Sequence, residues 1–366
     1  MILNNFVINK MAEINDFAVV DLFCGIGGLT QGFINESLIV SAGVDFDESC
    51  RYAYEKNNHA KFIYKDVTQL TVDELNSLYP AEKRKILVGC APCQPFSIYN
   101  YKNNNNVEKQ KEDTKWRLLY SFSDLIEKTQ PEIVSMENVP QLKTFNKGQV
   151  FNDFVEHLKK SDYEVSFGIY DAQDYGVPQR RKRLILLASK NGKIDLIPPT
   201  HTKNNYVTVR QAIGHLNRIK DGEHCKDDFL HYSRKLADMT KKRIQATPEG
   251  GGWKDWDESL LLECHKKKGG KMYSSVYGRM SWDNVAPTMT TYCTGLNNGR
   301  FGHPEQDRAI SLREAAILQS FSENYDLIEP NKGFNIQTLS RQIGNAVPVG
   351  LGQAIAKSIK NHIETL

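Results

Sequence analysis

The sequence has no long hydrophobic run. No stretch of its 366 residues approaches the roughly 20 consecutive apolar residues that a membrane-spanning helix needs. The segment from Met1 to Asp16 also lacks the basic start, the apolar block and the small-residue cleavage site of a signal peptide. We therefore expect a cytoplasmic protein without a membrane partner.

Cysteine is scarce, and its spacing excludes two common uses. The seven cysteines stand at positions 24, 50, 90, 93, 225, 264 and 293, and an odd, scattered set is typical of reduced thiols rather than of a disulfide framework. No set of Cys and His residues has the spacing of a zinc site. We expect no bound metal.

Net charge is low, at +3, but it is unevenly distributed. Residues 190–300 contain 19 Lys and Arg against 12 Asp and Glu, whereas the rest of the chain has a net charge of −4. A positively charged region favours a polyanionic partner. A lysine-rich, solvated surface is the other interpretation of the same residues.

What the chain does contain is an alternation of apolar runs and helix-like segments. With 40% hydrophobic residues it can bury a large core. The strand-like runs are 17–23, 39–44, 85–89, 132–136, 164–170 and 184–188, and the helix-like segments are 29–35, 48–56, 117–128 and 149–160. This alternation predicts an α/β fold with a doubly wound, Rossmann-like sheet.

Two segments interrupt the alternation. Residues 99–115 are rich in asparagine, and we interpret them as a loop that is either a lid over a site or an inert surface loop, with the lid favoured. From residue 190 to about 280, Gly, Pro, Lys and Trp become frequent, and helical signals return at Ser311 and after Pro348. We therefore expect a large α/β domain over 1–189 and 301–366, and a smaller, irregular domain over 190–300.

A glycine-rich turn connects the first strand to the first helix. Gly25, Gly27 and Gly28 allow a ligand to approach the backbone and leave free N–H groups at the helix start. The turn departs from the dinucleotide-binding pattern Gly-x-Gly-x-x-Gly, because Thr30 stands at the third glycine position. By itself it is weak evidence for a nucleotide.

Side chains after the next two strands suit a nucleoside. Asp45 ends the second strand, where an acid can bind a ribose diol, and Phe46 beside it can stack on an adenine. Asp66, after a short third strand, can accept a hydrogen bond from the adenine amino group. Each acid alone is also typical of an ordinary loop, but together they indicate a nucleoside site.

Cys93 follows the strand-like run 85–89, at the position where a nucleophile is expected in such a sheet. Cys90 and Cys93 also have the spacing of a redox Cys-x-x-Cys motif. Redox motifs of this kind open the first helix of a small domain, whereas this one follows a strand of a large sheet. We interpret Cys93 as reactive and Cys90 as buried and inert.

Two further groups are predicted near Cys93. Glu137 ends an apolar strand and is expected in the same cleft. Arg181 and Arg183, in the run Gln179-Arg180-Arg181-Lys182-Arg183, supply guanidinium donors that can hold a phosphate or a base carbonyl. A basic cluster alone is usually a solvated edge, but here it accompanies a thiol and an acid.

These motifs, taken in order, resemble those of the bacterial DNA cytosine-5 methyltransferases of restriction-modification systems, and the resemblance covers nearly the whole chain. The matching motifs are Phe23-x-Gly25-x-Gly27, Pro92-Cys93-Gln94, Glu137-Asn138-Val139, Gln179-x-Arg181-x-Arg183, Arg313-Glu314-Ala315 and Gly344-Asn345-Ala346-Val347-Pro348. The resemblance implies that residues 190–300 form the target-recognition domain, which is also where the positive charge lies.

The resemblance also implies a mechanism. The Cys93 thiolate adds to carbon 6 of cytosine while Glu137 contacts ring nitrogen 3, so that carbon 5 can take a methyl group from S-adenosylmethionine and leave S-adenosylhomocysteine. Arg181 would hold the cytosine carbonyl and help to keep Cys93 ionised, and Arg183 would position the site. The base must be flipped out of the duplex, with residues 99–115 closing over it.

Carried over residue by residue, the resemblance gives two further sets of contacts. The expected cofactor-binding residues are Phe23, Gly25, Ile26, Gly27, Gly28, Asp45, Phe46, Asp66, Val67, Pro92, Leu118, Asn345 and Val347. The expected substrate-binding residues are Gln94, Ser97, Asn138, Gln179, Arg279 and Arg300.

Two other functions fit parts of the sequence. A catalytically inactive DNA-binding relative is disfavoured because Cys93, Glu137 and Arg181 are all present. A tRNA-cytosine methyltransferase has similar catalytic motifs, but the long basic segment favours double-stranded DNA as the partner. We expect a monomer that associates with the nucleoid. The sequence leaves open whether a cognate restriction endonuclease, acting separately, exists.

Overall fold

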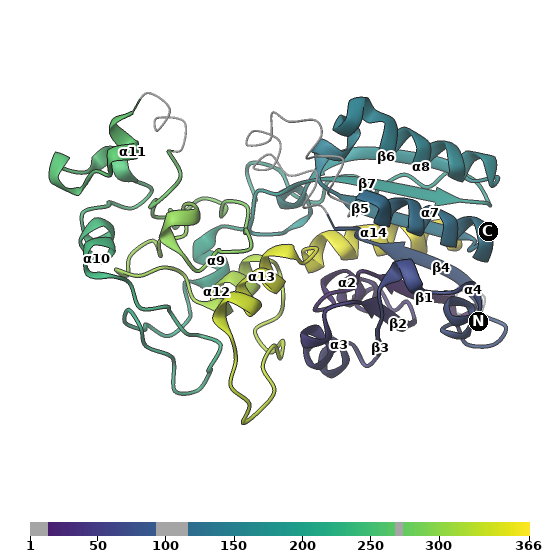
Figure 1. Ribbon diagram of the computed structural model, residues 1–366, viewed down its shortest axis with the longest axis horizontal. Coiled ribbons are helices and arrows are strands. Elements are labelled where there is room, and N and C mark those ends of the chain that lie inside the picture. Colours follow the sequence, from purple (N-terminus) through teal and green to yellow (C-terminus); the bar gives the residue numbers. More distant parts are fainter. Residues whose placement is uncertain (1–13, 93–115, 268–273) are drawn as a thin grey trace, which may run out of the picture. The chain divides into compact units, whose positions relative to one another are not determined.

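The computed structural model describes residues 14–92, 116–267 and 274–366 (Figure 1). Cys93, Gln94, Ser97 and the predicted lid over 99–115 lie outside these residues. Within the described residues, no helix is long and apolar enough to cross a membrane.

A seven-stranded sheet forms the centre of the first part of the chain (Figure 1). Its strands lie in the order β3-β2-β1-β4-β5-β7-β6. They are β1 (Phe17–Leu22), β2 (Val40–Asp45), β3 (Lys61–Tyr64), β4 (Arg84–Gly89), β5 (Ile133–Asn138), β6 (Glu164–Asp171) and β7 (Lys182–Ser189). Strands β1 to β5 are parallel, and every residue of β1 and β5 is buried, as expected for parallel strands covered on both faces.

The predicted α/β sheet is therefore confirmed, with one difference at its edge. The run 182–189 pairs antiparallel with both β5 and β6 instead of continuing the parallel series. Residues 172–181, between β6 and β7, are too few for a helical crossover, which needs a dozen or more residues, so the chain returns antiparallel.

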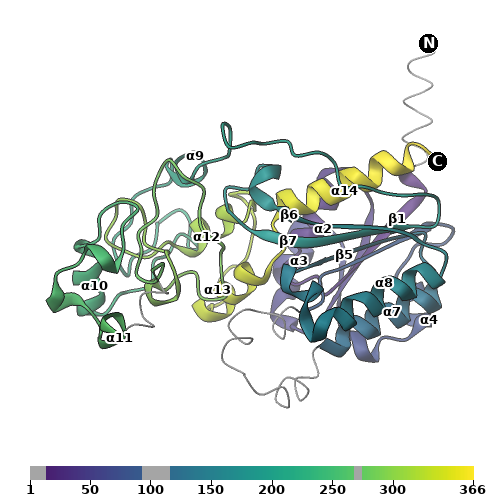
Figure 2. The same ribbon diagram turned by 90° about the horizontal axis from the view of Figure 1, so that it is seen from above.

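Helices cover both faces of the sheet (Figure 2). On one face lie α2 (Gly28–Asn35), α3 (Arg51–Asn58) and α14 (Val349–Ile363), and on the other lie α4 (Val72–Ser77), α7 (Arg117–Thr129) and α8 (Gln149–Lys160). Successive residues of a strand point to opposite faces of the sheet. On β1, the alternate residues Ala18, Val20 and Leu22 belong to the same core cluster as Leu119 and Phe122 of α7. This is the doubly wound arrangement predicted from the sequence.

Helix α14 brings the end of the chain against its beginning. Its Gly352 and Gln353 lie so close to Gly32 of α2 that a Cβ atom at residue 32 would be 2.4 Å from the backbone of both. Glycine is required here because the two helix backbones are almost in contact.

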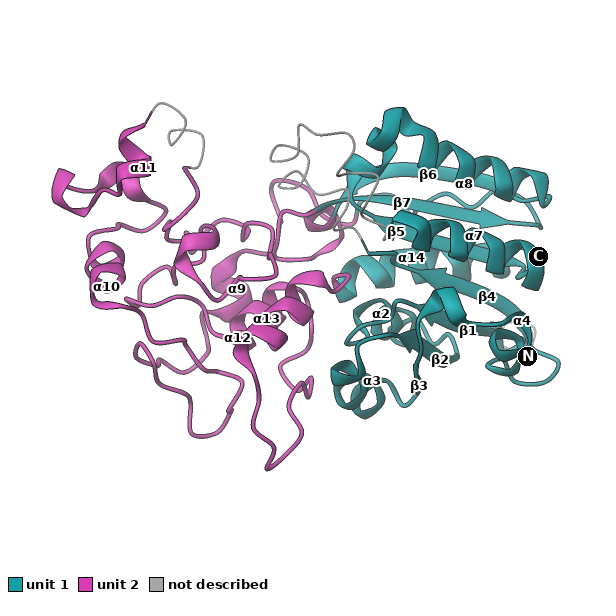
Figure 3. Cartoon of the chain, in the orientation of Figure 1, with its two compact units in different colours: residues 1–171, 182–199, 349–366 teal, residues 172–181, 200–348 magenta. Residues whose placement is uncertain are grey.

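The described chain forms two compact units (Figure 3). Unit 1 comprises residues 1–171, 182–199 and 349–366, and unit 2 comprises residues 172–181 and 200–348. Unit 1 contains the sheet. Residues 301–348, expected to belong to the α/β domain, thus group with 200–300, and the assignment of DNA recognition to 190–300 stays a prediction.

Unit 2 consists of short helices and loops. Its helices are α9 (Val209–Ile213), α10 (Asp238–Gln245), α11 (Glu263–Lys266), α12 (Leu312–Leu318) and α13 (Ile336–Asn345). Helix α12 begins with the predicted capping box, in which the Ser311 hydroxyl accepts from the Glu314 N–H and the Glu314 carboxylate accepts from the Ser311 N–H. The same carboxylate pairs with the fully buried Arg308 guanidinium at 2.7 and 2.8 Å.

Candidate active site

The carboxyl ends of five parallel strands meet at one edge of the sheet. Strand β1 pairs with β2 on one side and with β4 on the other, so the chain order reverses between β1 and β4. Ligands of open α/β sheets bind at such a reversal, beyond the carboxyl ends of the strands. The glycine turn, Asp45 and Asp66 follow the strands on one side of it, and Cys90, Pro92 and Glu137 follow or end those on the other.

Glu137 is the buried acid at this edge, and its side chain is only 3% exposed. Its Oε1 accepts from Nε of Arg183 at 2.8 Å, and its Oε2 accepts from the Cys90 thiol at 2.7 Å. The sheet register explains this cluster. Gly89 lies opposite Met136, which places Cys90 beside Glu137, and Glu137 lies opposite Ile185, two residues from Arg183.

The loop after Cys90 is fastened to the end of β5. The Asn138 side chain is fully buried, donates to the Ala91 carbonyl at 3.1 Å and accepts from the Val139 N–H at 2.9 Å. Asn138 therefore fixes the backbone that leads to Pro92 and, beyond the described residues, to Cys93. Its predicted contact with the substrate stays untested.

The glycine turn adopts a conformation that few side chains tolerate. Gly25 and Gly27 have φ angles of 51° and 88°, and Phe23 has a φ of 62°. The Gly25 N–H donates to Oδ2 of Asp45 at 2.8 Å, which ties the turn to the end of β2. Among the described residues, apart from Gly25 and its two chain neighbours, no atom lies within 4 Å of the position that a Cβ on Gly25 would occupy, so these residues leave open space beside the turn.

Next to the turn are the groups expected to bind a nucleoside. The Asp45 carboxylate is buried and accepts from the N–H groups of Gly25 and Asp47; its burial raises its pKa above the ordinary value. Phe46 is 59% exposed, so its ring is accessible to a ligand. Asp66 is exposed and caps a helical turn through Thr68, while Val67 after it is buried. An open glycine turn, an exposed ring and two carboxyl groups fit an adenosine.

The remaining predicted cofactor residues are divided between the units. Ile26, Gly28, Leu118 and Pro92 belong to unit 1, where Ile26 and Gly28 are buried and Leu118 and Pro92 are half-buried. Asn345, which is exposed, and Val347, which is buried, belong to unit 2. Their contribution to the cofactor site stays a prediction.

A buried acid lies beneath the turn and was not assigned a role from the sequence. Asp21, near the end of β1, accepts from the Thr30 hydroxyl of α2 at 2.7 Å, and Thr30 also bonds Tyr54. Burial raises the pKa of Asp21 from 3.8 to about 7. The strand and the helix on either side of the glycine turn are thus joined through one carboxyl group.

The structure gives Gln179 and Arg181 internal partners within unit 2. The Gln179 amide donates to the Leu318 carbonyl and to the Gln319 side chain and accepts from the Met289 N–H, each at 2.9 Å. The Arg181 guanidinium donates to the carbonyls of Met289 at 2.8 Å, Gly344 at 2.9 Å and Ala346 at 3.3 Å. These bonds connect three segments of unit 2. The arginine that forms an ion pair with Glu137 is instead Arg183, in unit 1.

The two arginines predicted to contact DNA are also committed internally. All five guanidinium N–H groups of the buried Arg279 are used, by four backbone carbonyls and by Asp307. Arg300 donates from Nη1 to the carbonyls of Gly250, Gly251 and Arg279. The predicted contacts of Arg279 and Arg300 with DNA stay predictions.

Sequence reasoning also missed the contact of Cys90, which it interpreted as inert. The signal was available, because Cys90 and Glu137 each stand one residue past the end of their strand-like runs, 85–89 and 132–136. Only the register of β4 against β5 places these residues side by side, and that register is not encoded in either run alone.

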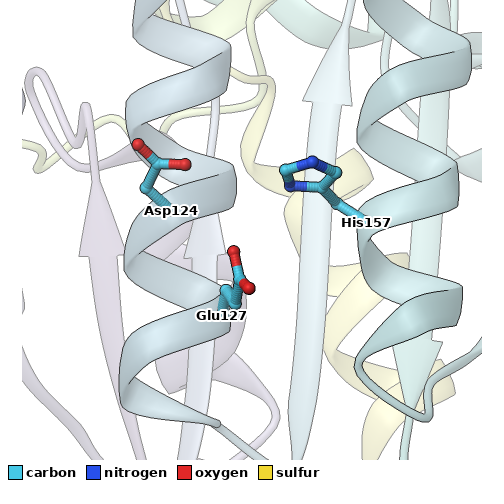
Figure 4. Close-up of side chains that lie close together, drawn as sticks. All are labelled: Asp124, Glu127 and His157. Atoms are coloured by element: carbon cyan, nitrogen blue, oxygen red, sulfur yellow. The ribbon is translucent and has the colours of Figure 1, made fainter.

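Asp124 and Glu127 of α7 and His157 of α8 are the one group of three metal-ligand side chains close together in the described part of the chain (Figure 4). Their potential ligand atoms lie within 4.8 Å of one another. Both carboxylates are exposed, and Nδ1 of His157 is hydrogen-bonded to the Ser123 hydroxyl at 3.1 Å. We assign no metal to this group.

Comparison with known proteins shows which family this chain is similar to. The family model for C-5 cytosine-specific DNA methylase matches residues 17–361. Type II methylase M.HgiDII of Herpetosiphon aurantiacus is 54% identical over 95% of this chain and 96% of its own. Type II methyltransferase M1.HphI of Haemophilus parahaemolyticus is 29% identical over 93% and 86%. The solved structure of the methyltransferase EhMeth of Entamoeba histolytica is similar in fold, with a TM-score of 0.64 at 17% identity over 94% and 98% of the two chains.

Proposed function

Since this chain belongs to the C-5 cytosine-specific DNA methylase family and is a DNA (cytosine-5)-methyltransferase of restriction-modification type, we propose that it methylates one cytosine within a specific word of double-stranded DNA through a covalent enzyme–base adduct. The methylation protects host DNA from a separate endonuclease. The single observation that carries the chemical proposal is the Glu137 carboxylate, held by Arg183 and Cys90 at the strand edge that leads to Cys93.

Cys93 is the nucleophile in this proposal. Carbon 5 of cytosine is too electron-poor to attack a methyl group directly, and addition of a thiolate to carbon 6 makes carbon 5 nucleophilic. The sulfur leaves when the hydrogen on carbon 5 is removed, which regenerates the thiolate. Cys93 lies outside the described residues, but Asn138 fixes the backbone two residues before it through the Ala91 carbonyl.

Glu137 stabilises the charge that this addition creates. When the thiolate adds to carbon 6, negative charge develops on the ring, and a carboxyl group that hydrogen-bonds or protonates nitrogen 3 compensates it. Arg183 holds the Glu137 carboxylate at 2.8 Å and fixes its position. We therefore assign the positioning of Glu137 to Arg183, and to Arg181 the bracing of unit 2 through backbone carbonyls.

The glycine turn and its neighbours bind the cofactor. S-adenosylmethionine, when bound, supplies an electrophilic methyl group. The open space at Gly25 admits a ligand close to the backbone, the exposed Phe46 ring offers a stacking surface, and Asp45 and Asp66 offer hydrogen-bond acceptors. Oxygens of Asp45 that already accept backbone N–H groups are fixed in place and keep a second lone pair for a hydroxyl.

Double-stranded DNA is the proposed substrate. The excess of positive charge in residues 190–300 supports a polyanion, and a base stacked within a duplex must be flipped out before carbon 6 can be reached. Transfer RNA is the alternative substrate, and a direct comparison of the two distinguishes them.

The test is methyl transfer by the purified chain from labelled S-adenosylmethionine to duplex DNA and to tRNA, followed by nucleoside mass spectrometry and bisulfite sequencing. We expect 5-methyldeoxycytidine at one position of one DNA word. Cys93→Ala and Glu137→Gln should each lower the rate by about a thousandfold or more while the Kd for S-adenosylmethionine stays within about twofold. Methylation of tRNA but not of DNA, or full turnover by Cys93→Ala, would contradict the proposal.

A further inference from the structure

Cys90 touches the acid of the active site, although nothing in its sequence context assigned it a role. Its thiol donates to Oε2 of Glu137 at 2.7 Å. We propose that Cys90 is a positioning residue for methyl transfer, which acts by holding the Glu137 carboxyl group in the plane that meets the cytosine ring. This inference rests on the proposed function.

Two donors from two different strand ends fix the carboxyl group more completely than one. The terminal torsion of a glutamate is broad. A single hydrogen bond from Arg183 to Oε1 therefore leaves the plane of the carboxyl group free to turn. The Cys90 thiol, beyond the end of β4, contacts Oε2, while Arg183 in β7 contacts Oε1. The plane of the carboxyl group is then determined by bonds at both oxygens.

The Cys90 side chain is not needed to hold its own backbone. The Cys90 N–H donates to the Leu22 carbonyl at 3.3 Å, and the next carbonyl, of Ala91, accepts from Asn138. Both bonds survive any substitution of the thiol. We therefore expect a change at Cys90 to act on Glu137 while these two backbone bonds stay in place.

A thiol can serve both protonation states of its neighbour. While Glu137 is ionised, the S–H donates to it, and if the carboxyl group carries a proton the sulfur can accept. A hydroxyl can do the same, whereas a methyl group can do neither. Cys90 forms no covalent bond in this role, and no proton leaves the thiol.

The experiment compares two matched pairs of variants, Cys90→Ser with Cys90→Ala and Cys90→Thr with Cys90→Val. Within each pair, the members differ chiefly in the hydroxyl group. The single-turnover rate of methyl transfer is measured over a range of pH at saturating DNA and S-adenosylmethionine, and melting temperature and the two Kd values report folding and binding. Cys264→Ser, at an exposed cysteine, is the control.

We expect Cys90→Ala to be slower than Cys90→Ser by about fivefold, the value of one weak hydrogen bond to a charged group, with both Kd values unchanged. If packing alone matters, Thr and Val will be equally slow, and that equality overturns the inference.

Failure of this inference is distinguishable from failure of the proposed function. If Glu137→Gln is inactive while Cys90→Ala matches the wild type in rate, only the role of Cys90 is wrong. If Glu137→Gln keeps the wild-type rate, the proposed chemistry itself is wrong, whatever Cys90 does.

Discussion

At the scale of single residues, the buried acids at the strand ends have different partners. Glu137 has a guanidinium and a thiol as donors, whereas one oxygen of Asp21 accepts from Thr30 and the other has no hydrogen-bond partner among the described residues. Burial raises the pKa of Asp21 to about 7. The two groups therefore suit different tasks: in the proposed mechanism Glu137 contacts the cytosine ring, whereas Asp21 joins β1 to α2 through Thr30.

The raised pKa of Asp21 predicts a pH dependence of stability. Because the folded protein binds this proton more tightly than the unfolded chain, the stabilisation is complete below pH 3.8 and is lost as pH rises toward about 7. The side chain of Asp21→Asn cannot lose a proton. As pH rises over this window, the free energy of unfolding of the variant should therefore increase relative to that of the wild type by up to about 1.4 kcal/mol per pH unit. Urea unfolding at several pH values measures the difference.

The control is Asp73→Asn, at an exposed position of α4. Its difference from the wild type should stay constant with pH. A difference for Asp21→Asn that is equally constant from pH 4 to 7 would show that Asp21 does not hold its proton in the folded protein.

Residue roles could be predicted only in part. The thiol, the acid and the arginines were recognised by motif, but sequence could not tell which arginine meets Glu137, since Arg181 and Arg183 are two residues apart. The boundary between the units separates them: Arg181 belongs to the segment 172–181 of unit 2, and Arg183 is the second residue of β7, which pairs with β5. A motif gives the residue types, and strand pairing decides the partners.

At the scale of elements, most strands and helices follow from local pattern. Fully buried strands such as β1 and β5 consist of short apolar runs, and α7 and α8 show the helical period. The antiparallel direction of β7 does not follow, because it depends on the length of the connection after β6. Helix α13 was missed because six of its ten residues are polar.

The contact between α2 and α14 is a further feature that no local pattern reveals. Because a Cβ on Gly32 would lie 2.4 Å from the α14 backbone, Gly32→Ala must push the helices apart, and we expect a loss of about 3 kcal/mol in the free energy of unfolding. Gly333→Ala is the matched control, since no atom of the described residues other than its chain neighbours lies within 4 Å of a Cβ at residue 333. Denaturant unfolding measures both variants. An equally small effect of both variants, within about 0.5 kcal/mol, would contradict the close packing.

The capping box of α12 contains a buried ion pair. Burial alone would raise the pKa of Glu314, but the Arg308 guanidinium outweighs it and lowers the pKa from 4.5 to about 2. Glu314→Gln leaves Arg308 buried without its counter-charge, so we expect a loss of about 3–5 kcal/mol in the free energy of unfolding at pH 7.

Lowering the pH should have the same effect on the wild type. The stabilisation from Glu314 is present above pH 4.5 and is lost as pH falls toward about 2. Glu305→Gln, which removes an exposed partner of Arg218, should cost much less, because a solvated ion pair contributes little to stability. Acid unfolding of the wild type and urea unfolding of the two variants measure these effects. Equal losses of free energy of unfolding for Glu305→Gln and Glu314→Gln would contradict the argument.

At the scale of the whole molecule, the division into units differs from the change in composition along the sequence. Composition marks residue 190 as a boundary, but residues 172–181 belong to unit 2 through Gln179 and Arg181, which bond residues more than 100 positions away. Such contacts cannot be predicted from local composition. The excess of positive charge in 190–300 nevertheless predicts that DNA affinity depends on salt concentration.

DNA affinity should depend steeply on salt, because phosphate contacts release counterions. Lys242→Gln, at an exposed lysine of α10, should weaken binding to specific and unrelated duplexes alike and lower the slope of log K against log salt by about one. Lys159→Gln on α8 makes the same change of charge in unit 1 and should leave the slope unchanged. Fluorescence anisotropy between low and physiological salt tests this, and equal slopes for both variants would contradict a basic surface on unit 2.

The most direct test of the central claim is covalent trapping. With S-adenosylmethionine and a duplex whose target cytosine carries fluorine at carbon 5, the sulfur cannot leave, because fluorine cannot be removed as a proton. We predict a complex that survives denaturation, with the mass of one chain, one DNA strand and one methyl group, attached at Cys93 and absent from Cys93→Ala. If unmodified duplex is methylated at carbon 5 but no such complex forms, cytosine methylation by this chain does not proceed through a bond between Cys93 and the base.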